Sequence, residues 1–479
     1  VAQAVSLLQR SIRCEPESLE DRVASVPPGV WLSLARVAVG MRHVDRADPD
    51  RILVDSQERD VKFGLCRGPL LASTTTSRGE AVHVAIIAVD MIVEQFVGAP
   101  HRAGGPVTLE VTLHAYYEWE AASFLDATCN NSNATVAQGT SGVKLPTDMR
   151  SRTQWHYECH LGGTRIIGVG RARRPTMVHV RCPIKRTVFL GDHINVTFVA
   201  RTTEMNSQEE ASDIIIPIEV CASTPVRVSS AACTEPLYGM DTMEKRWPGH
   251  FSRWVHYHLY TLRYGLLDIY DLDGSVADLV WPFAETGRVR YWPRWSSMIG
   301  LDRFDTNCKY VGEYLAYQHC AVMHRGVSQW VAIIHSPDSF LVPGIKSRQG
   351  SSGAVLVADL LSAASPDVAS FILGSWTFDG PRRSSSGSVL QDFPWRRKSH
   401  IGGHEYVIYD PKLTDYAEPH GVLHLEHVPY PGAVYRVAPE LWVFHHYVSI
   451  FVERNLRILR RFSLVWDLGH MVLDRFLLA

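Results

Sequence analysis

Acidic side chains follow two apolar runs of the sequence. Asp271 and Asp273 come directly after the run Gly265–Tyr270, and Asp338 follows the run Trp330–Ile334. Carboxylate oxygens are the ligands that hard divalent cations prefer, and such a cation neutralises a diphosphate leaving group as its bond breaks. The same Asp-x-Asp-Gly pattern is common in a solvated turn after a strand, and here we favour the functional interpretation.

Two classes of enzyme would use carboxylates in this way. A nucleotide-dependent transferase places them against phosphates and a metal ion, whereas a hydrolase uses a pair of them to activate water. Asp271 and Asp338 are the pair that a hydrolase would use. No feature of the sequence supports water activation over nucleotide binding, so the hydrolase is the weaker hypothesis.

The elements that must position these residues change in kind along the 479-residue chain. Strand-like runs alternate with helix-compatible stretches over 223–450, with one helix expected near Val276–Glu285, and this pattern predicts an α/β domain. Short alternating runs over 76–222 predict a β-rich, sandwich-like accessory domain. Residues 1–75 are expected to form a stem or an accessory segment.

The last segment, 451–479, has a helical apolar stripe with arginines elsewhere. We expect an amphipathic helix that packs on the preceding domain or on a second subunit of a homodimer. Membrane-surface binding is the alternative that the arginines would suit.

Aromatic residues gather in the predicted β-rich domain. They can form a sugar-stacking platform or an aromatic core, and the core is the commoner outcome. The residues concerned are Tyr116, Tyr117, Trp119, Trp155 and Tyr157.

Composition narrows the class of partner and of compartment. A formal net charge of -2 argues against a nucleic-acid partner. Nine cysteines without a Cys-x-x-Cys pair favour isolated disulfides, whose pairing is open, and three Asn-x-Ser/Thr sequons begin at Asn130, Asn133 and Asn195. Together these features predict a protein of the secretory pathway, and the most apolar run, Ala81–Ala99, carries charges that argue against a membrane span.

A series of short motifs runs through the second half of the chain. Their types and their order resemble those of glycosyltransferase family 92, and the resemblance covers roughly half of the sequence. In order, the motifs are Cys233-Thr-Glu-Pro-Leu-Tyr-Gly239, Trp254-Val-His-Tyr-His258, Leu267-Asp-Ile-Tyr-Asp-Leu-Asp-Gly-Ser275, Trp330-Val-Ala-Ile-Ile-His-Ser-Pro-Asp-Ser-Phe-Leu-Val-Pro343, Trp376-Thr-Phe-Asp-Gly380, Lys398-Ser399 and His446-Tyr447.

The resemblance implies a GT-A fold, an α/β domain that binds a nucleotide sugar over the carboxyl ends of its strands. It further implies inverting transfer of a hexose, typically galactose from UDP-galactose, to an oligosaccharide or polysaccharide acceptor with Mn²⁺ as cofactor. The implied location is the Golgi lumen, as a type II membrane protein whose anchor is not part of this sequence.

The resemblance also assigns roles to residues of this chain. The metal is expected at Ser336, Asp338 and His420, although the family's motif has further acids where this chain has Ser336 and Ser339. A catalytically silent relative that binds a glycan or stabilises a partner enzyme is therefore the alternative. The nucleotide sugar is expected to contact Tyr270, Asp271, Asp273, His258, Lys398 and His446. Inverting transfer needs a base, for which Asp379 is the first candidate and Glu418 or Glu405 are the others.

Overall fold

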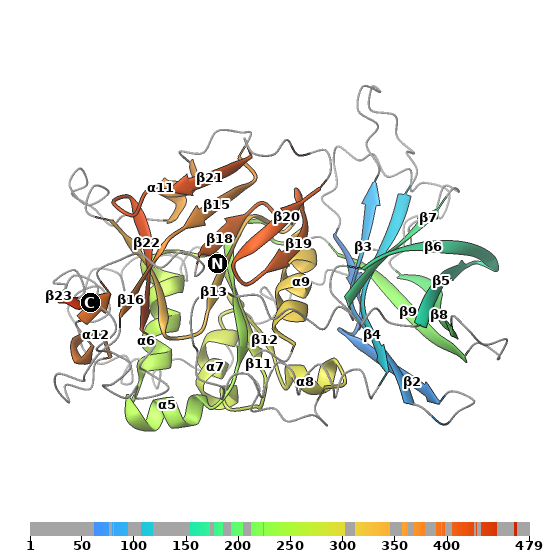
Figure 1. Ribbon diagram of the computed structural model, residues 1–479, viewed down its shortest axis with the longest axis horizontal. Coiled ribbons are helices and arrows are strands. Elements are labelled where there is room, and N and C mark those ends of the chain that lie inside the picture. Colours follow the sequence, from blue (N-terminus) through green and yellow to red (C-terminus); the bar gives the residue numbers. More distant parts are fainter. Residues whose placement is uncertain are drawn as a thin grey trace, which may run out of the picture.

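The described part of the chain is mostly β-strand and forms two units that lie against each other (Figure 1). The computed structural model describes residues 62–75, 79, 81–93, 107–117, 153–172, 177–184, 193–204, 212–223, 225–301, 312–344, 357–362, 368–378, 389–393, 395–397, 405–425, 428, 433–447 and 464–466. Strands β1 to β9 build the first unit, and helices and strands together build the second.

The first unit is a nine-stranded antiparallel sheet that curls on itself. Its strand order is β1-β9-β8-β5-β6-β7-β4-β3-β2. The apolar side chains of its inner face close into one core that contains Val111, Val180 and Phe198, all fully buried. The strands are β1 (Lys62–Leu65), β2 (Leu70–Thr75), β3 (Ala81–Val93), β4 (Val107–Tyr117), β5 (Thr153–Leu161), β6 (Thr164–Ala172), β7 (Met177–Ile184), β8 (His193–Glu204) and β9 (Ser212–Ser223).

Strand β6 turns the corner of this sheet. Its first half pairs with β5 as far as Gly168, and its second half pairs with β7 from Val169 onward. A Cβ atom on Gly168 would lie 2.6 Å from a methyl group of Val180, and one on Gly170 would lie 2.8 Å from the Tyr157 ring. Glycine at these positions therefore lets the two halves of the sheet approach each other.

The sequence-based boundaries of the β-rich domain need one correction. The domain was expected over 76–222, but the sheet begins at Lys62, because β1 pairs with β9 and β2 pairs with β3. The disulfide Cys66–Cys221 links the turn after β1 to β9, and the disulfide Cys159–Cys182 links β5 to β7. Disulfides of this kind are typical of proteins that fold in oxidising compartments, as the isolated cysteines predicted.

The aromatic residues of this unit form a core where they are described. Tyr116 is fully buried and donates to the Gly300 carbonyl oxygen at 2.8 Å, and Tyr157 stacks on Phe198 with ring centroids 5.9 Å apart. A cavity of about 390 Å³ beside β1, β8 and β9 is lined by aliphatic and polar residues. The structure thus favours the aromatic-core interpretation over the sugar-stacking platform for Tyr116 and Tyr157, whereas Trp119 lies outside the described residues.

The second unit is built on a seven-stranded mixed sheet with the order β12-β11-β10-β13-β18-β15-β21. The first four of these strands are parallel, and β18 runs antiparallel to both of its neighbours. The strands are β10 (Val228–Leu237), β11 (Leu266–Asp271), β12 (Val289–Trp292), β13 (Ser328–His335), β15 (Ser370–Leu373), β18 (Tyr406–Tyr409) and β21 (Val434–Val437). The strands expected at 265–270 and 330–334 are confirmed as β11 and β13, and the helix expected near 276–285 is confirmed as α7.

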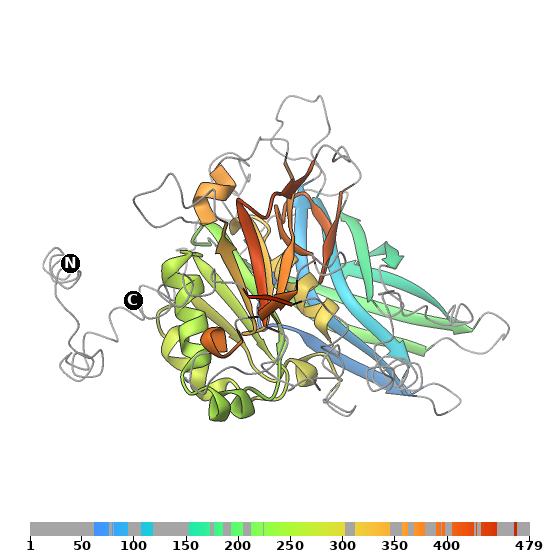
Figure 2. The same cartoon turned by 60° about the vertical axis from the view of Figure 1, so that its left-hand side comes forward.

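Helices cover both faces of this sheet (Figure 2). Along β13, Ala332 and Ile334 point into the core beneath α5, α6 and α7, whereas Val331 and Ile333 point into the core beneath α9. Because both faces of the strand are covered, it is apolar without alternation from Trp330 to Ile334. The helices are α5 (Met240–Arg246), α6 (His250–His256) with the π-helix η2 (Tyr257–Thr261), α7 (Ala277–Ala284), α8 (Trp295–Met298), α9 (Glu313–His324), α11 (Val357–Ser362) and α12 (Val389–Asp392).

Two smaller sheets complete the unit. A five-stranded sheet has the order β14-β22-β16-β17-β23, and β19 and β20 form a hairpin. Three residues, 336–338, separate the end of β13 from the start of β14, and there the chain passes from one sheet to the other. The strands are β14 (Ser339–Pro343), β16 (Ser375–Phe378), β17 (Trp395–Arg397), β19 (Thr414–Glu418), β20 (Gly421–His424), β22 (Trp442–Tyr447) and β23 (Leu464–Trp466).

The expected C-terminal helix is wrong where the structure describes it. Residues Leu464–Trp466 form β23, which pairs with β17. An apolar run of this length fits a strand as well as a helix, and pairing with an available edge decides between them. The rest of 451–479 lies outside the described residues.

The two units share both a core and a set of buried charges. Ala85 and Met177 of the first unit pack with Tyr317 of α9 in one cluster. Arg325, directly after α9, has its Nη1 atom 2.5 Å from Glu110 Oε1 of β4 and donates through Nη2 to the Thr414 carbonyl oxygen at 3.2 Å. Charges buried this deeply hold their positions only if both partners stay in place.

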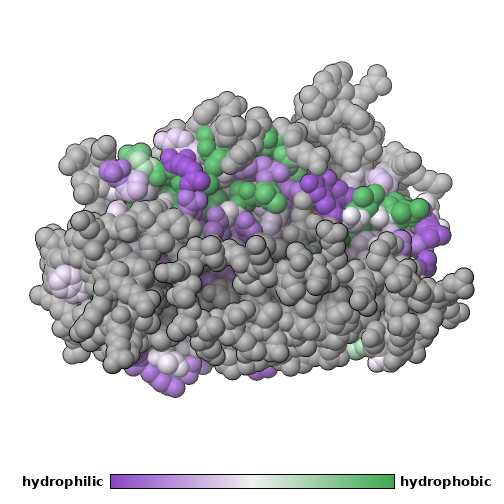
Figure 3. Space-filling view, viewed as in Figure 1, coloured by the Kyte–Doolittle hydropathy of each residue, from purple (hydrophilic) through white to green (hydrophobic). Residues whose placement is uncertain are grey.

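A second ion pair lies beside the first one. Lys62 Nζ is 3.0 Å from Asp90 Oδ1 and donates to the Val322 carbonyl oxygen at 2.8 Å. The two units are therefore joined through α9 by directional contacts as well as by apolar packing. On the face drawn in Figure 3, hydrophobic and hydrophilic residues of the described surface lie side by side. Within the described residues, no helix has the length and apolarity needed to cross a bilayer.

Candidate functional site

The carboxyl ends of the parallel strands lie at one edge of the mixed sheet. The strand order reverses between β10 and β13, since the chain goes from β10 outward to β11 and β12 and returns on the other side of β10. Open α/β sheets bind ligands outside the carboxyl ends of their strands at such a point. The polar residues that reach this edge are Glu235 from β10, Asp271 and Asp273 from the end of β11, and His335 to Ser339 from the β13–β14 connection.

Asp271 and Asp273 organise the loop that follows β11. Asp271 is fully buried and accepts hydrogen bonds from the backbone N–H of Gly274 at 2.8 Å and from the Tyr291 hydroxyl at 2.6 Å. Burial raises the pKa of Asp271, and these hydrogen bonds oppose the rise. Asp273 is exposed and accepts from the backbone N–H of Gly239 at 2.9 Å. Of the two, Asp273 is the residue that a ligand in solvent can reach.

Tyr270 and His258 do not fit the roles expected for them. Both side chains are fully buried. The Tyr270 ring packs edge-on against Trp295, and its hydroxyl is 2.8 Å from His319 Nδ1. His258 donates from Nδ1 to the Trp254 carbonyl oxygen at 2.9 Å and stacks on Phe340. They are core residues, because the faces of β11 and η2 that carry them are covered.

Burial of histidines predicts how stability changes with pH. Burial lowers the pKa of His250 and His258 to about 4 and that of His319 to about 3, from an ordinary value of 6.5. The unfolded chain then binds more protons than the folded chain between pH 6.5 and 4, so the free energy of unfolding decreases as the pH falls through that range. Each fully buried histidine contributes a slope of about 1.4 kcal/mol per pH unit.

Urea denaturation at pH 7, 6, 5 and 4.5 measures this slope. The His258→Phe variant should show a shallower slope than the wild type, while His156→Gln, which alters an exposed histidine, should leave it unchanged. A free energy of unfolding that stays constant over this range would contradict the prediction.

Three side chains of α6 and η2 donate hydrogen bonds to the backbone on both sides of Asp338. His250 donates to the Pro337 carbonyl oxygen at 2.8 Å, and Trp254 Nε1 donates to that of Ser339 at 2.8 Å. The Tyr257 hydroxyl donates to the Leu341 carbonyl oxygen at 2.7 Å. The aromatic motif of this helix therefore acts by fixing the backbone of the candidate site.

Asp338 lies in a closed set of hydrogen bonds. Its Oδ1 accepts from the hydroxyls of Ser336 at 2.8 Å and Ser339 at 2.9 Å, and its Oδ2 is 3.1 Å from His446 Nε2. Burial would raise the pKa of Asp338, but the charge and hydrogen bond of His446 and the two serine hydroxyls hold it below its usual range. Asp338 is thus an ionised carboxylate, and His446 contacts it directly, although the two residues were expected to bind different parts of the ligand.

The metal set expected from the resemblance does not fit this geometry. The oxygens of Asp338 are occupied by Ser336, Ser339 and His446. His420 instead lies beside His335, with ring centroids 5.3 Å apart, and its Nδ1 donates to the Glu405 carbonyl oxygen at 2.8 Å. Among the described residues, Asp338 and His420 belong to neither of the two groups whose ligand atoms are close enough to share an ion.

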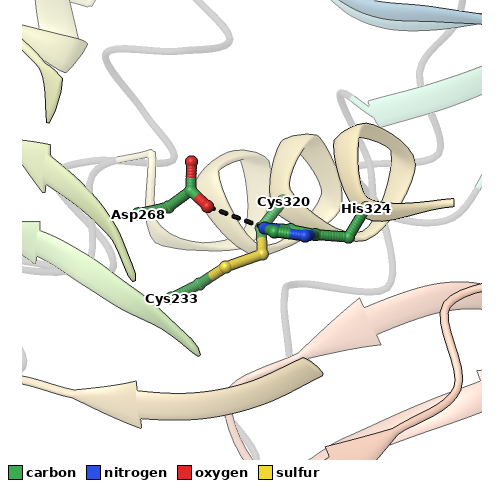
Figure 4. A group of neighbouring side chains, drawn as sticks. All are labelled: Cys233, Asp268, Cys320 and His324. Carbon is green, nitrogen blue, oxygen red and sulfur yellow. Dashed lines mark hydrogen bonds and ion pairs between the residues drawn. A yellow bond between two sulfur atoms is a disulfide. The ribbon is translucent and has the colours of Figure 1, made fainter. Parts of the chain in front are cut away.

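One of these two groups contains Cys233, Asp268, Cys320 and His324 (Figure 4). Cys233 and Cys320 are joined in a disulfide between β10 and α9, so their sulfur atoms are not thiolate ligands. Asp268 Oδ2 accepts from His324 Nε2 at 2.7 Å and from Arg290 Nη2 at 2.7 Å. The Arg290 cation opposes a second cation at this place, so the group is best described as a buried structural network.

The other group contains Glu235, Glu313 and His335 at the switch point of the sheet. The sequence analysis missed Glu235 and Glu313, which stand in the strand β10 motif and in the first turn of α9. Glu235 lies within the Cys-Thr-Glu-Pro-Leu motif and could have been noticed there, whereas Glu313 is brought in only by the packing of α9.

The three candidate bases differ in how close they lie to the carboxyl edge of the mixed sheet. Glu418 ends β19, one residue before Pro419, whose carbonyl oxygen is 3.1 Å from His335 Nε2, so it lies next to the candidate edge. Glu405 is next to β18, where Arg436 contacts its carboxylate. Asp379 and Lys398 lie outside the described residues.

Comparisons with known proteins add no family assignment. A scan against protein-family models and a search of curated proteins gave no match. The function is therefore argued from the site.

Proposed function

We propose that this chain binds a nucleotide sugar, with UDP as the nucleotide, at the carboxyl edge of its mixed sheet and transfers the hexose with inversion to a glycan acceptor. The observation that carries the proposal is the strand order β12-β11-β10-β13 with acidic residues near the carboxyl ends of β10, β11 and β13. A parallel order with a switch point is the arrangement that places a phosphate-bearing ligand between neighbouring strand ends. It agrees with the GT-A fold that the family 92 resemblance implies.

The chain supplies groups for each part of such a ligand. Exposed Asp273 is suited to accept hydrogen bonds from ribose hydroxyls, and His446 is suited to donate to a phosphate oxygen. Glu418 is the base we assign to the acceptor hydroxyl, and its position at the end of β19, next to Pro419 and the same edge, supports this assignment. Galactose as the hexose and Mn²⁺ as cofactor follow from the resemblance alone.

A catalytically silent scaffold is the second candidate, and one observation favours it. Asp338, which the resemblance assigns to the metal, is closed off by two serine hydroxyls and a histidine. A carboxylate held by three hydrogen bonds can stabilise the fold without contacting a metal ion. The geometry does not favour a hydrolase, because Asp271 and Asp338 are both buried in separate hydrogen-bond sets.

Titration calorimetry with UDP and with UDP-galactose, each with and without Mn²⁺, tests nucleotide binding. We expect saturable binding of UDP, weaker by about tenfold or more in Asp273→Asn because a hydrogen bond to a charged acceptor is lost. Asp278→Asn, which alters an exposed aspartate in the first turn of α7, is the matched control.

Release of UDP from UDP-galactose in the presence of glycan acceptors separates the two candidates. Turnover that is lost in Glu418→Gln supports the transferase. UDP binding without turnover supports the silent scaffold, and failure of the folded protein to bind any UDP-sugar would remove both nucleotide-based hypotheses.

The disulfides and the exposed sequon asparagine, Asn195 on β8, agree with folding in the secretory pathway. We place the protein in the Golgi lumen as part of the same proposal, since that is where UDP-sugar-dependent glycan transfer of this type takes place in the resembling family.

A further inference from the structure

We propose that Glu235, Glu313 and His335 bind a divalent transition-metal ion at the switch point of the mixed sheet. Their ligand atoms all lie within 4.8 Å of one another. Ligand atoms that share one ion at about 2.1 Å are about 3 to 4 Å apart, so the group has to contract only slightly. The site is separate from the set Ser336, Asp338 and His420 that the sequence predicts.

Three elements bring the ligands together. Glu235 stands one residue beyond Thr234, which is paired with His335 across the β10–β13 ladder. His335 has a left-handed backbone conformation with φ 54°, which bends the chain where β13 ends. Glu313 opens α9, whose N-terminal dipole stabilises a nearby carboxylate. The three side chains are thus fixed by the sheet and by a helix.

The orientation of the His335 ring is set from outside the group. Its Nε2 lies 3.1 Å from the Pro419 carbonyl oxygen, which can only accept, so Nε2 carries the proton in this contact. Nδ1 faces inward, 3.7 Å from Glu235 Oε2. Metal-binding histidines commonly donate their second ring N–H to a backbone carbonyl in this way, which fixes the tautomer that leaves a lone pair for the ion.

Tyr317 braces the group from its buried side. Its hydroxyl is 3.1 Å from Glu313 Oε1 and 3.2 Å from His335 Nδ1. Because the hydroxyl has one proton, it cannot donate to both atoms at once, and an ion between them would satisfy the remaining lone pair. The contact explains why a fully buried tyrosine points its polar end at this place.

Burial of the group leaves one side open. Glu313 is 3% exposed and His335 is 8% exposed, whereas the side chain of Glu235 is 21% exposed. Three protein ligands with an open side leave room for water or a phosphate oxygen to complete the coordination shell. Carboxylate ligands suit Mn²⁺, whereas an imidazole ligand suits Zn²⁺ or Fe²⁺ better than Mn²⁺. A site with two carboxylates and one imidazole therefore fits a divalent transition-metal ion such as Mn²⁺, Fe²⁺ or Zn²⁺.

The experiment uses Mn²⁺ alone as the probe. Protein stripped with EDTA and exchanged into metal-free buffer is titrated with Mn²⁺, and free Mn²⁺ is followed by its electron paramagnetic resonance signal. We expect one saturable site whose affinity falls at least tenfold in Glu235→Gln, in Glu313→Gln and in His335→Gln. Glu285→Gln, an exposed glutamate of the same unit, is the matched control and should bind as the wild type does.

Thermal unfolding supplies a second readout. Mn²⁺ should raise the Tm of the wild type and of Glu285→Gln but not that of Glu235→Gln, whose partly exposed side chain makes it the variant best able to fold. A folded wild type that shows no saturable Mn²⁺ binding, or variants that bind with wild-type affinity, would overturn the proposal. Both readouts are free of nucleotide, so they can fail while UDP binding succeeds, and the reverse.

Discussion

Replacing Arg325 with alanine is expected to lower the free energy of unfolding by about 3 to 5 kcal/mol, because it removes the nearest cation of buried Glu110, whose other arginine partner, Arg181, is partly exposed. Arg325 is 10% exposed and contacts Glu110 at 2.5 Å, with Asp90 at 3.8 Å. Burial would raise the pKa of Glu110, but the charges of Arg325, His179 and Arg181 lower it to about 2. Removing the guanidinium of Arg325 takes away the largest of the attractions that keep Glu110 ionised.

Urea denaturation at pH 7 measures the loss. Arg201→Ala is the matched control, since Arg201 pairs with Asp213 in a half-exposed ion pair whose loss should cost no more than about 1 kcal/mol. The contribution of ionised Glu110 to stability is complete above its ordinary pKa of 4.5 and is lost as the pH falls towards 2. The free energy of unfolding of Arg325→Ala should therefore decrease less steeply than that of the wild type in this pH range. Equal effects of the two arginine substitutions would show that the units are not joined through Arg325.

Asp268→Asn is the second substitution with a large expected effect, a loss of about 3 kcal/mol or more. Asp268 is fully buried, and its oxygens accept from Arg290 at 2.7 Å, His324 at 2.7 Å and Trp292 Nε1 at 2.9 Å. The asparagine keeps the shape but loses the negative charge, and its amide group turns hydrogens towards donors. Arg290 would then lie beside Asp268's position, which Figure 4 shows next to His324, without a counter-charge.

The dependence of the free energy of unfolding on pH at acidic pH distinguishes this effect from a nonspecific loss of stability. Burial opposes ionisation of Asp268, but the charges of Arg290 and His324 hold its pKa well below the ordinary value of 3.8. Its contribution is therefore complete above pH 3.8 and is lost only as the pH falls below that value. Asp213→Asn, which alters the half-exposed carboxylate, should cost little at neutral pH. An Asp268→Asn protein as stable as the wild type would contradict the assigned network.

Local sequence patterns predict two strands and one helix of the second unit. The apolar run before Asp271 and the run Trp330–Ile334 both form strands, because both faces of the sheet are covered and the pattern is continuous. The start of the first unit is less readable, since β1 and β2 become strands only by pairing with β9 and β3. Such long-range pairing leaves no local signal in the short segments concerned.

The details of the candidate site do not follow from the sequence. The resemblance assigns Asp338 to a metal ion and His446 to a diphosphate, and it does not predict that the two side chains contact each other at 3.1 Å. It does not show that Tyr270 and His258 point into cores, because the facing of a residue on a buried strand or helix depends on what packs there. The approach of Glu313 to His335 likewise depends on where α9 docks, which no motif reports.

The buried charges between the two units have a consequence for the order of synthesis. Strands β1 to β9 are complete in sequence by Ser223, about a hundred residues before Arg325 is made. At about 5 to 20 residues per second, the first unit emerges from the ribosome about 5 to 20 s before Arg325. During that interval Asp90 can pair with Lys62 and Glu110 with Arg181, because both cations belong to the first unit, so the nascent β-rich unit carries its own partners for these carboxylates until α9 docks.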